Sequence, residues 1–153
     1  MSELKDRLRA DLTASIKGRE ALRSSTIRMV LTALTNAEVA GKSARELKDD
    51  EVLAVIGSEA KKRREAAEAF DAGNRPELAA KEREEAEILA VYLPEQLSAE
   101  EIVSIVAEAV TTSGTAGAGM KAMGKVMGII APRVKGRVDG GVVAAEVKRQ
   151  LGI

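Results

Sequence analysis

The sequence predicts an all-α protein with an N-terminal unit of about four helices and a small C-terminal unit of three helices. Apolar residues recur at helical spacing along almost the whole chain, and no segment has the pattern of a credible strand. Pro94, in the segment LPEQLS, breaks this pattern. We therefore predict an N-terminal domain over residues 1–93, a linker over 94–97 and a C-terminal domain over 98–153.

Two helices that should pack together are expected at the start of the chain. The first ends near Gly18 and has an apolar stripe formed by Leu4, Leu8, Leu12 and Ile16. The second begins near Ser24-Ser25-Thr26, which is a good N-cap cluster, and stops at Gly41. Its apolar residues are Ile27, Val30, Leu31 and Leu34.

Two further helices complete the predicted N-terminal domain. Asp49 or Asp50 can cap a long third helix that closes at Gly73-Asn74. Its helically spaced apolar residues are Val52, Val55, Ile56, Ala66 and Phe70. Pro76 suits the first turn of a fourth helix. The inner face of that helix is formed by Leu78, Ala86, Leu89 and Tyr92.

The C-terminal domain is predicted to begin with a capping box. Ser98 and Glu101 have the required spacing and open a fifth helix. That helix buries Ile102, Ile105, Val106, Ala109 and Val110. The polar loop TTSGTAGAG follows, and then two short helices. One lies around 120–131 and is ended by Pro132, and the other is capped by Asp139 and runs to Leu151.

Composition excludes several classes of function. Of the 153 residues 45% are hydrophobic, which is enough for a core, and 24 basic residues balance 24 acidic ones. Any electrostatic function must therefore come from local asymmetry. There is no cysteine and no histidine, which removes disulfides, thiolate zinc sites, cysteine nucleophiles and imidazole bases. With Phe70 and Tyr92 as the only aromatic residues, stacking on unpaired RNA bases is not expected.

No segment predicts attachment to a membrane. The N-terminal stretch MSELKDRLRADL alternates charge with leucine, unlike a signal peptide or an anchor. The longest apolar runs, such as VMGIIA, are far shorter than a membrane span. We expect a cytoplasmic protein with no membrane partner.

The stretch GMKAMGKV resembles a phosphate-binding loop by spacing alone. Gly119, Gly124 and Lys125 match the Walker pattern, but Val126 stands where a serine or threonine should hold magnesium. No strand precedes the stretch. A helical interpretation accounts for more residues, because it predicts a core face of Met120, Met123, Met127 and Ile130. Neither a nucleotide, another cofactor nor a metal is expected.

Between Gly114 and Arg137 the chain has five basic residues and no acidic one. This cluster is the clearest functional signal in a neutral chain and predicts contacts with nucleic-acid phosphates. The predicted binding residues are Lys121, Lys125, Arg133, Lys135 and Arg137. A solvated helix face followed by a basic connector is the alternative interpretation.

Two other charged runs are interpreted as exposed helix surface. The run Lys61-Lys62-Arg63-Arg64 is largely neutralised by glutamates four residues away, which are Glu59, Glu65 and Glu68. The acidic run consists of Glu82, Glu84, Glu85 and Glu87. It could supply a pair of carboxylates for acid–base chemistry or a metal site, but we expect these side chains to face solvent. We assign no catalytic residue.

Four segments together resemble the GatB/YqeY family, and the match covers nearly the whole chain. They are IRMVLTALTNAEVA, DDEVLAVIGSEAKKRREAAEAF, AVYLPEQLS and MKAMGKVMGIIAPRVKGRVDGG. The resemblance implies an all-helical protein whose C-terminal unit is similar to a tail domain of the glutamine-dependent aspartyl/glutamyl-tRNA amidotransferase. In that enzyme the tail follows the ATP-using portion and helps to hold tRNA. The matching motif positions are Met123, Gly124, Lys125, Val126, Met127, Lys135, Gly136, Arg137, Asp139 and Gly140.

Three functions follow from the residues and the resemblance. The leading hypothesis is a non-catalytic adaptor that binds tRNA or another structured RNA through the C-terminal basic residues. The second is an accessory subunit for a carbon–nitrogen ligase that uses glutamine as amide donor, working with an amidotransferase or synthetase partner. The third is a protein-interaction module that uses the charged helices of residues 50–92. The amidotransferase's own catalytic portions have no counterpart in this sequence.

Overall fold

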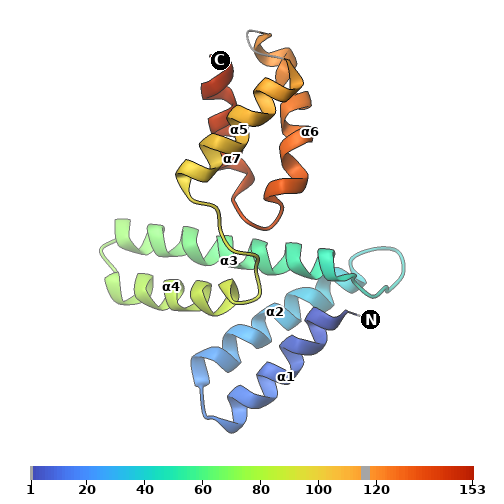
Figure 1. Ribbon diagram of the computed structural model, residues 1–153. Coiled ribbons are helices and arrows are strands. Elements are labelled where there is room, and N and C mark those ends of the chain that lie inside the picture. Colours follow the sequence, from blue (N-terminus) through green and yellow to red (C-terminus); the bar gives the residue numbers. More distant parts are fainter. Residues whose placement is uncertain (1, 115–117) are drawn as a thin grey trace. The chain divides into compact units, whose positions relative to one another are not determined.

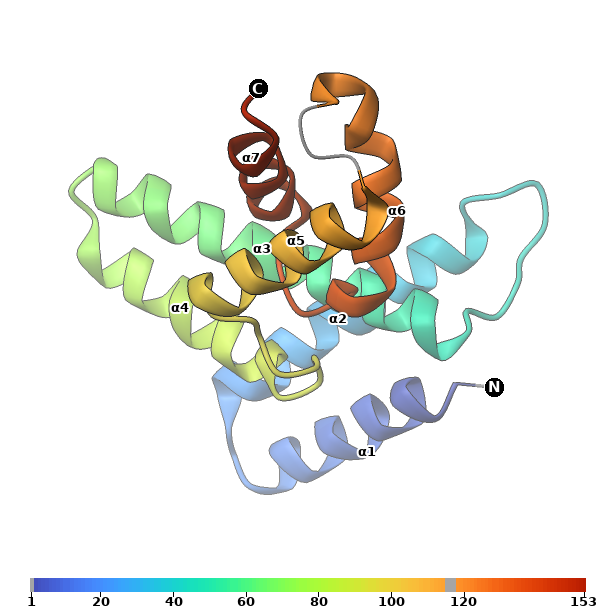
Figure 2. The same ribbon diagram turned by 45° about the horizontal axis from the view of Figure 1, so that its top comes forward.

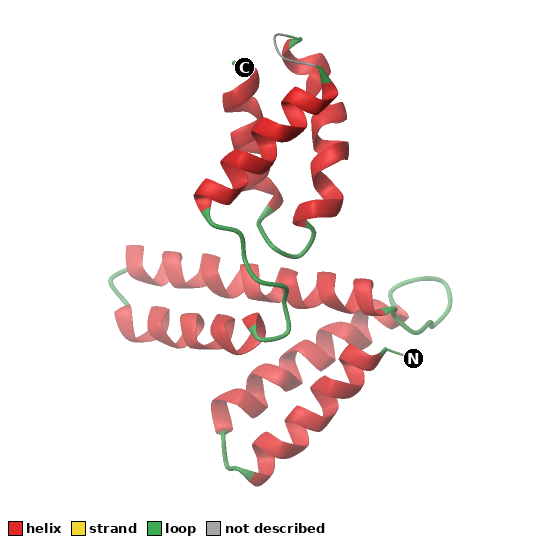
Figure 3. Cartoon of the chain, in the orientation of Figure 1, coloured by secondary structure: helices red, strands yellow, loops and turns green. Residues whose placement is uncertain are grey.

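The computed structural model describes residues 2–114 and 118–153, and every regular element within them is helical (Figure 3). The chain divides into two compact units, Met1–Pro94 and Glu95–Ile153. Four α-helices lie in the described part of the first unit and three in that of the second. The all-α prediction is therefore confirmed.

The first unit consists of two helical hairpins (Figure 1). Helices α1 (Glu3–Lys17) and α2 (Ala21–Val39) form one hairpin, and α3 (Asp49–Ala72) and α4 (Pro76–Ala90) form the other. The core between the hairpins is almost entirely aliphatic and contains Leu8, Ile27, Val30, Leu34, Leu47, Val52, Ile56, Ala60, Leu89 and Tyr92.

The predicted apolar stripe of α1 is correct at its centre and wrong at its end. Leu8 is fully buried, whereas Ile16 is 48% exposed and Ser15 is buried in its place. Each step of four residues rotates the side chain by about 40° beyond a full turn, so two steps carry Ile16 out of the interface. Ser15, seven residues after Leu8, stays in line and bonds the Ser24 hydroxyl at 2.7 Å.

The prediction that Ser24-Ser25-Thr26 caps the second helix is also wrong. Helix α2 begins at Ala21, so these residues lie within it. Arg19 reverses the chain with a φ of 56°, and the buried Ser24 is held by Ser15 instead of capping. The hydroxyl of Thr26 donates to the Leu22 carbonyl at 2.8 Å.

Helix α3 begins at Asp49, but its N-cap is Lys48 and not an aspartate. The Asp49 carboxylate accepts the Ser2 hydroxyl, which ties the start of α1 to α3. Glu51 accepts the Lys48 backbone N–H at 2.9 Å, and its hydrogen bond with Arg45 is the main reason its pKa falls to about 2.

The predicted end of α3 at Gly73-Asn74 and the predicted start of α4 at Pro76 are both confirmed.

Tyr92 connects the end of α4 to the first hairpin. Its ring is buried, and its hydroxyl donates to the Asp11 carboxylate of α1. Arg7 lies over the ring, with Cζ 4.7 Å from the centroid, and Arg23 of α2 lies 4.0 Å from the same carboxylate. Burial, followed by the bond to Asp11, raises the pKa of Tyr92 to about 12, so the phenol remains a donor at neutral pH.

Three residues of the charged runs of α3 and α4 are less exposed than expected, while the others are exposed as predicted. The three are Arg63, Glu82 and Glu85. Arg63 turns toward α4, where Glu82 lies 3.5 Å and Glu85 3.8 Å from its guanidinium nitrogens. Glu59 instead pairs with Lys62 at 3.0 Å. Burial, reinforced by the neighbouring Glu82, raises the pKa of Glu85. Glu82 and Glu85 thus form a half-buried carboxylate pair around one cation, a long-range contact that helical spacing cannot show.

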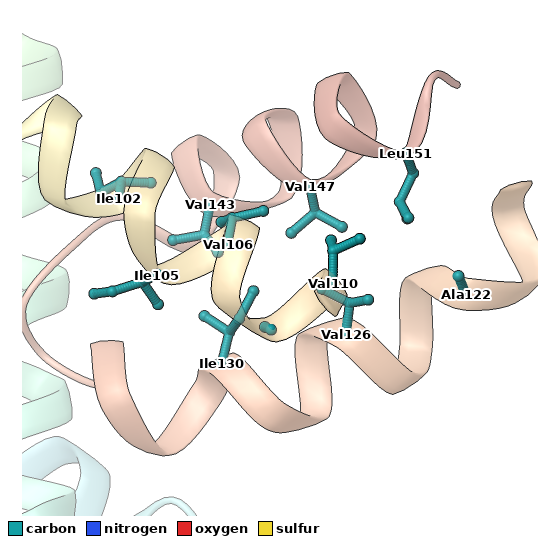
Figure 4. Close-up of a cluster of buried hydrophobic side chains, with 11 residues drawn as sticks. Ile102, Ile105, Val106, Val110, Ala122, Val126, Ile130, Val143, Val147 and Leu151 are labelled. Atoms are coloured by element: carbon teal, nitrogen blue, oxygen red, sulfur yellow. The ribbon is translucent and has the colours of Figure 1, made fainter. Parts of the chain in front are cut away.

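The second unit is a three-helix bundle of α5 (Ala99–Ser113), α6 (Met123–Val134) and α7 (Gly140–Leu151), with a 3₁₀ turn η1 (Gly119–Ala122) before α6. All five predicted core residues of α5 are buried. They meet Ala122, Val126 and Ile130 from η1 and α6 on one side, and they meet α7 on the other (Figure 4). From α7 the core receives Val143, Val147 and Leu151.

The two predicted caps of this unit are confirmed, and two boundaries differ. Ser98 accepts the Glu101 N–H at 3.1 Å, and Asp139 accepts the Gly141 N–H at 2.9 Å. Residues 111–113 of the predicted loop belong to α5, while 115–117 lie outside the described residues. Pro132 lies inside α6 instead of ending it, and only Arg133 and Val134 follow it in the helix.

Tyr92→Phe should destabilise the first unit by about 1.5–3 kcal/mol, since it removes a hydrogen bond to a charged group and leaves Asp11 less well paired. Urea unfolding of the variant and of Asp11→Ala, with the double variant to close the cycle, measures the coupling between the two side chains. If the two losses simply add, the Tyr92–Asp11 bond does not stabilise the fold.

Glu85→Gln should raise the melting temperature by a few degrees at neutral pH. The raised pKa of Glu85 means that its ionised form opposes folding, and this penalty disappears as the pH falls through the folded-state pKa. The advantage of the variant should therefore shrink in acid. Thermal melts of the parent and the variant from neutral pH into acid test this prediction. The control is Glu84→Gln, a change at an exposed neighbour. A lower melting temperature of Glu85→Gln at neutral pH would mean that ionised Glu85 stabilises the fold, which would contradict the prediction.

Candidate nucleic-acid interface

The helical phase of η1 and α6 decides which side chains face solvent. The buried residues are Ala122, Val126 and Ile130, spaced by four. The predicted methionine face is correct for Ile130 but wrong for Met120, which is 62% exposed. Met123 and Met127 lie at the edge of the core. A 3₁₀ turn has three residues per turn, so η1 shifts Met120 away from the face that α6 buries.

Two lysines and two glycines lie on the exposed side of η1 and α6. Lys121, Gly124, Lys125 and Gly128 are spaced i, i+3, i+4 and i+7, and all four are exposed. We call these residues the lysine–glycine stripe. A Cβ added at Gly124 or Gly128 would meet no atom within 4 Å. Packing therefore does not require glycine there, and the backbone lies open between the lysines.

The electrostatic setting of the stripe favours an anion. Lys121 and Lys125 lie at the start of α6, where no acidic side chain stands in the first turn and no side chain caps the helix. The partial positive charge of a helix N-terminus adds to these cations. Lys125 Nζ also donates to the Ser113 carbonyl at the end of α5, at 3.1 Å, which holds the ammonium in place. Helix stability alone would favour acidic residues here.

Arg133 and Lys135 lie at the other end of α6. Arg133 is separated from Lys125 by eight residues, or about 12 Å along the helix. Its guanidinium lies 2.9 Å from the Glu108 carboxylate of α5. The basic run is free of acids in sequence, but in space α5 supplies one. Lys135 follows the end of α6 and its side chain is exposed.

Arg137 is half-buried and ties the start of this unit to the loop between α6 and α7. Its Nε donates to the Glu95 carbonyl at 3.1 Å, and its own carbonyl accepts the Leu97 N–H at 2.9 Å. The Gln96 side chain donates to the Gly136 carbonyl at 3.1 Å. Gly136 has a φ of 75°, a left-handed conformation that favours glycine. We call these bonds the loop contact.

The loop contact gives two sequence motifs a shared structural explanation. The EQL portion of the YLPEQLS joint is hydrogen-bonded directly to Gly136 and Arg137 of the KGRVDGG segment. Sequence reasoning treated these motifs separately, since about 40 residues separate them. Of the five predicted binding residues, the structure brings Lys121 and Lys125 together, pairs Arg133 with Glu108, and uses Arg137 to hold the loop contact.

This arrangement fits recognition of phosphates better than acid–base or metal chemistry. Within residues 2–114 and 118–153 no three acidic side chains gather as a metal-binding group. None of the helices in that part of the chain is long and apolar enough to cross a membrane. What the unit offers is a stripe of fixed positive charge over exposed backbone.

Comparison with known proteins relates the chain to one family. The model of a family described as Yqey-like protein matches residues 5–151. The chain is also similar to an uncharacterized protein of Schizosaccharomyces pombe, with 35% identity over 92 residues, which cover 60% of this chain and 72% of that protein. The family match spans both helical units and includes the whole lysine–glycine stripe and the loop contact.

Proposed function

This chain belongs to the YqeY-like protein family, and we propose that within it the chain is a non-catalytic adaptor that binds tRNA or another structured RNA. The single observation that carries the proposal is the lysine–glycine stripe. It combines two exposed lysines, one of them held by the Ser113 carbonyl, with a helix N-terminus and exposed glycines, and this combination suits phosphate oxygens.

The chemistry of the stripe suits a folded RNA better than an unpaired strand. Lysines contact phosphates as point charges, and phosphate contacts carry no direct sequence information. The only aromatic residues, Phe70 and Tyr92, belong to the first unit, so the C-terminal unit has no aromatic side chain on which bases could stack. Recognition would therefore depend on the shape of the backbone, as it does for helical RNA.

The five basic residues have different roles in the proposed contact with RNA. Lys121 and Lys125 bind phosphate directly, and Lys135 extends the positive surface. Arg133 joins only when phosphate displaces the exposed Glu108 carboxylate. Arg137 acts mainly by holding the loop between α6 and α7 in place.

Reversing the two stripe lysines should abolish most RNA binding without unfolding the protein. Two to four phosphate contacts predict a log–log salt dependence with a slope of roughly −1.5 to −3.5 for the parent. In Lys121→Glu/Lys125→Glu the slope should shrink by about two. Titration of unfractionated tRNA at several salt concentrations, with duplex DNA of equal length as comparison, measures both. The matched control is Lys42→Glu/Lys148→Glu, which makes the same charge change at exposed positions elsewhere.

Two results of this titration would reject the proposal. One is an absence of tRNA binding by the parent even at low salt. The other is an equal loss of affinity in the stripe variant and the control variant, which would mean that net charge and not the stripe governs binding. Circular dichroism of both variants shows whether the helices are retained.

Filling the stripe should raise stability and lower RNA affinity at the same time. Gly124→Ala and Gly128→Ala replace exposed helical glycines next to open space, so each should stabilise the unit by about 0.5–1 kcal/mol. If phosphates approach the open backbone, the added methyl groups should weaken tRNA binding. Gly141→Ala, in the first turn of α7, is the control glycine for the binding measurement. Unchanged affinity in the two stripe variants would confine the contact to the lysine ammonium groups.

A further inference from the structure

Helices α3 and α4 repeat one pattern on the same side of their hairpin. Both contain Arg-Glu-x-Ala-Glu, at residues 64–68 of α3 and 83–87 of α4. The helices lie side by side and run in opposite directions (Figure 2). The two alanines of the pattern, Ala67 and Ala86, are both buried, at 1% and 8% exposure. Antiparallel helices with equal patterns give this face an approximate two-fold axis that passes between the alanines.

A groove lies along this face. It has a volume of about 380 Å³, its floor is formed by the buried Ala67 and Ala86, and the exposed Ala90 also lines it. Its rim consists of the charged residues of the pattern, which are Arg64, Glu68, Arg83 and Glu87. All four are exposed. An alanine floor allows the stem of a long side chain or another helix to come close to the helical backbones.

The rim has balanced charge and is only partly paired within the chain. Arg83 forms an ion pair with Asp71, and the charge of Glu68 also acts on it. In the described part of the chain, the side chains of Arg64 and Glu87 form neither a hydrogen bond nor an ion pair. The groove therefore presents two arginines and two glutamates in a symmetric arrangement, with one charge of each sign available to a partner.

We propose that this groove is an isologous contact between two copies of the chain. In a two-fold dimer the same patch faces itself, so the patch must be complementary to its own rotated copy. A single-sign patch cannot meet this condition, whereas this rim does. Rotation by 180° about an axis in the plane of the patch places the arginines of one copy beside the glutamates of the other, because arginine and glutamate lie four residues apart on each helix.

Close packing follows from the same residues. The aliphatic stems of the partner's arginines cover the alanine floor, and their guanidinium groups reach the rim glutamates. An unrelated partner would have no need of a repeated pattern on both helices. The proposal is independent of RNA binding, since the groove belongs to the first unit and the lysine–glycine stripe to the second.

Charge exchange between two variants tests the contact. Sedimentation velocity of the full chain over a wide concentration range, without RNA, should show a monomer–dimer equilibrium that weakens as salt is added. Arg64→Glu/Arg83→Glu, and separately Glu68→Arg/Glu87→Arg, should each weaken the dimer by about tenfold or more, because every interchain pair becomes repulsive. Mixing the two variants should restore a dimer that contains one chain of each kind.

Two further variants separate loss of the dimer from loss of folding and from the effect of a charge change outside the groove. Arg64→Glu alone removes no ion pair within the described chain, so it should weaken the dimer while leaving the melting temperature unchanged. Lys81→Glu, an exposed change on α4 outside the groove, should leave the dimer intact. A chain that remains monomeric at the highest concentration, a dimer unaffected by the charge reversals, or variants that do not associate when mixed would each overturn the proposal.

Discussion

Burial of one side of α6 is the constraint on which the candidate function depends. Ala122, Val126 and Ile130 fill the space between α5 and α7, and together they fix the rotation of α6 about its axis. Once that rotation is fixed, Lys121, Gly124, Lys125 and Gly128 must face outward. A different rotation would expose the buried Ala122, Val126 and Ile130 to water. The exposed stripe is therefore a consequence of the buried one.

Local chemistry made much of the fold predictable from sequence. Ser98 and Asp139 cap helices, and Pro76 starts one, because each effect depends on residues only a few positions away. Errors appeared where a neighbouring helix decides the outcome. Ser24 looked like a cap until Ser15 of α1 provided a buried partner, and Ile16 matched a stripe that had already rotated away from α2.

The candidate site shows the same limit more sharply. Sequence identified a segment with cations and no acids, and within it the structure leaves Lys121 and Lys125 exposed. It could not show that Glu108 of α5 reaches Arg133, or that Arg137 turns back to Glu95. Charge counted along a chain misses pairs between helices. It also missed the half-buried Glu82 and Glu85, whose shared cation comes from α3.

The two proposed surfaces differ in how their charges are arranged, and that difference determines what each can bind. The lysine–glycine stripe has one sign of charge, which suits a polyanion such as RNA and repels a second copy of itself. The α3–α4 groove has both signs in a two-fold pattern, which gives a polyanion little net attraction but complements its own rotated copy. The stripe and the groove share no residue, so occupation of one does not use up the side chains of the other. A dimer would then present two stripes, and an RNA long enough to reach both would bind more tightly through linked sites than through either stripe alone.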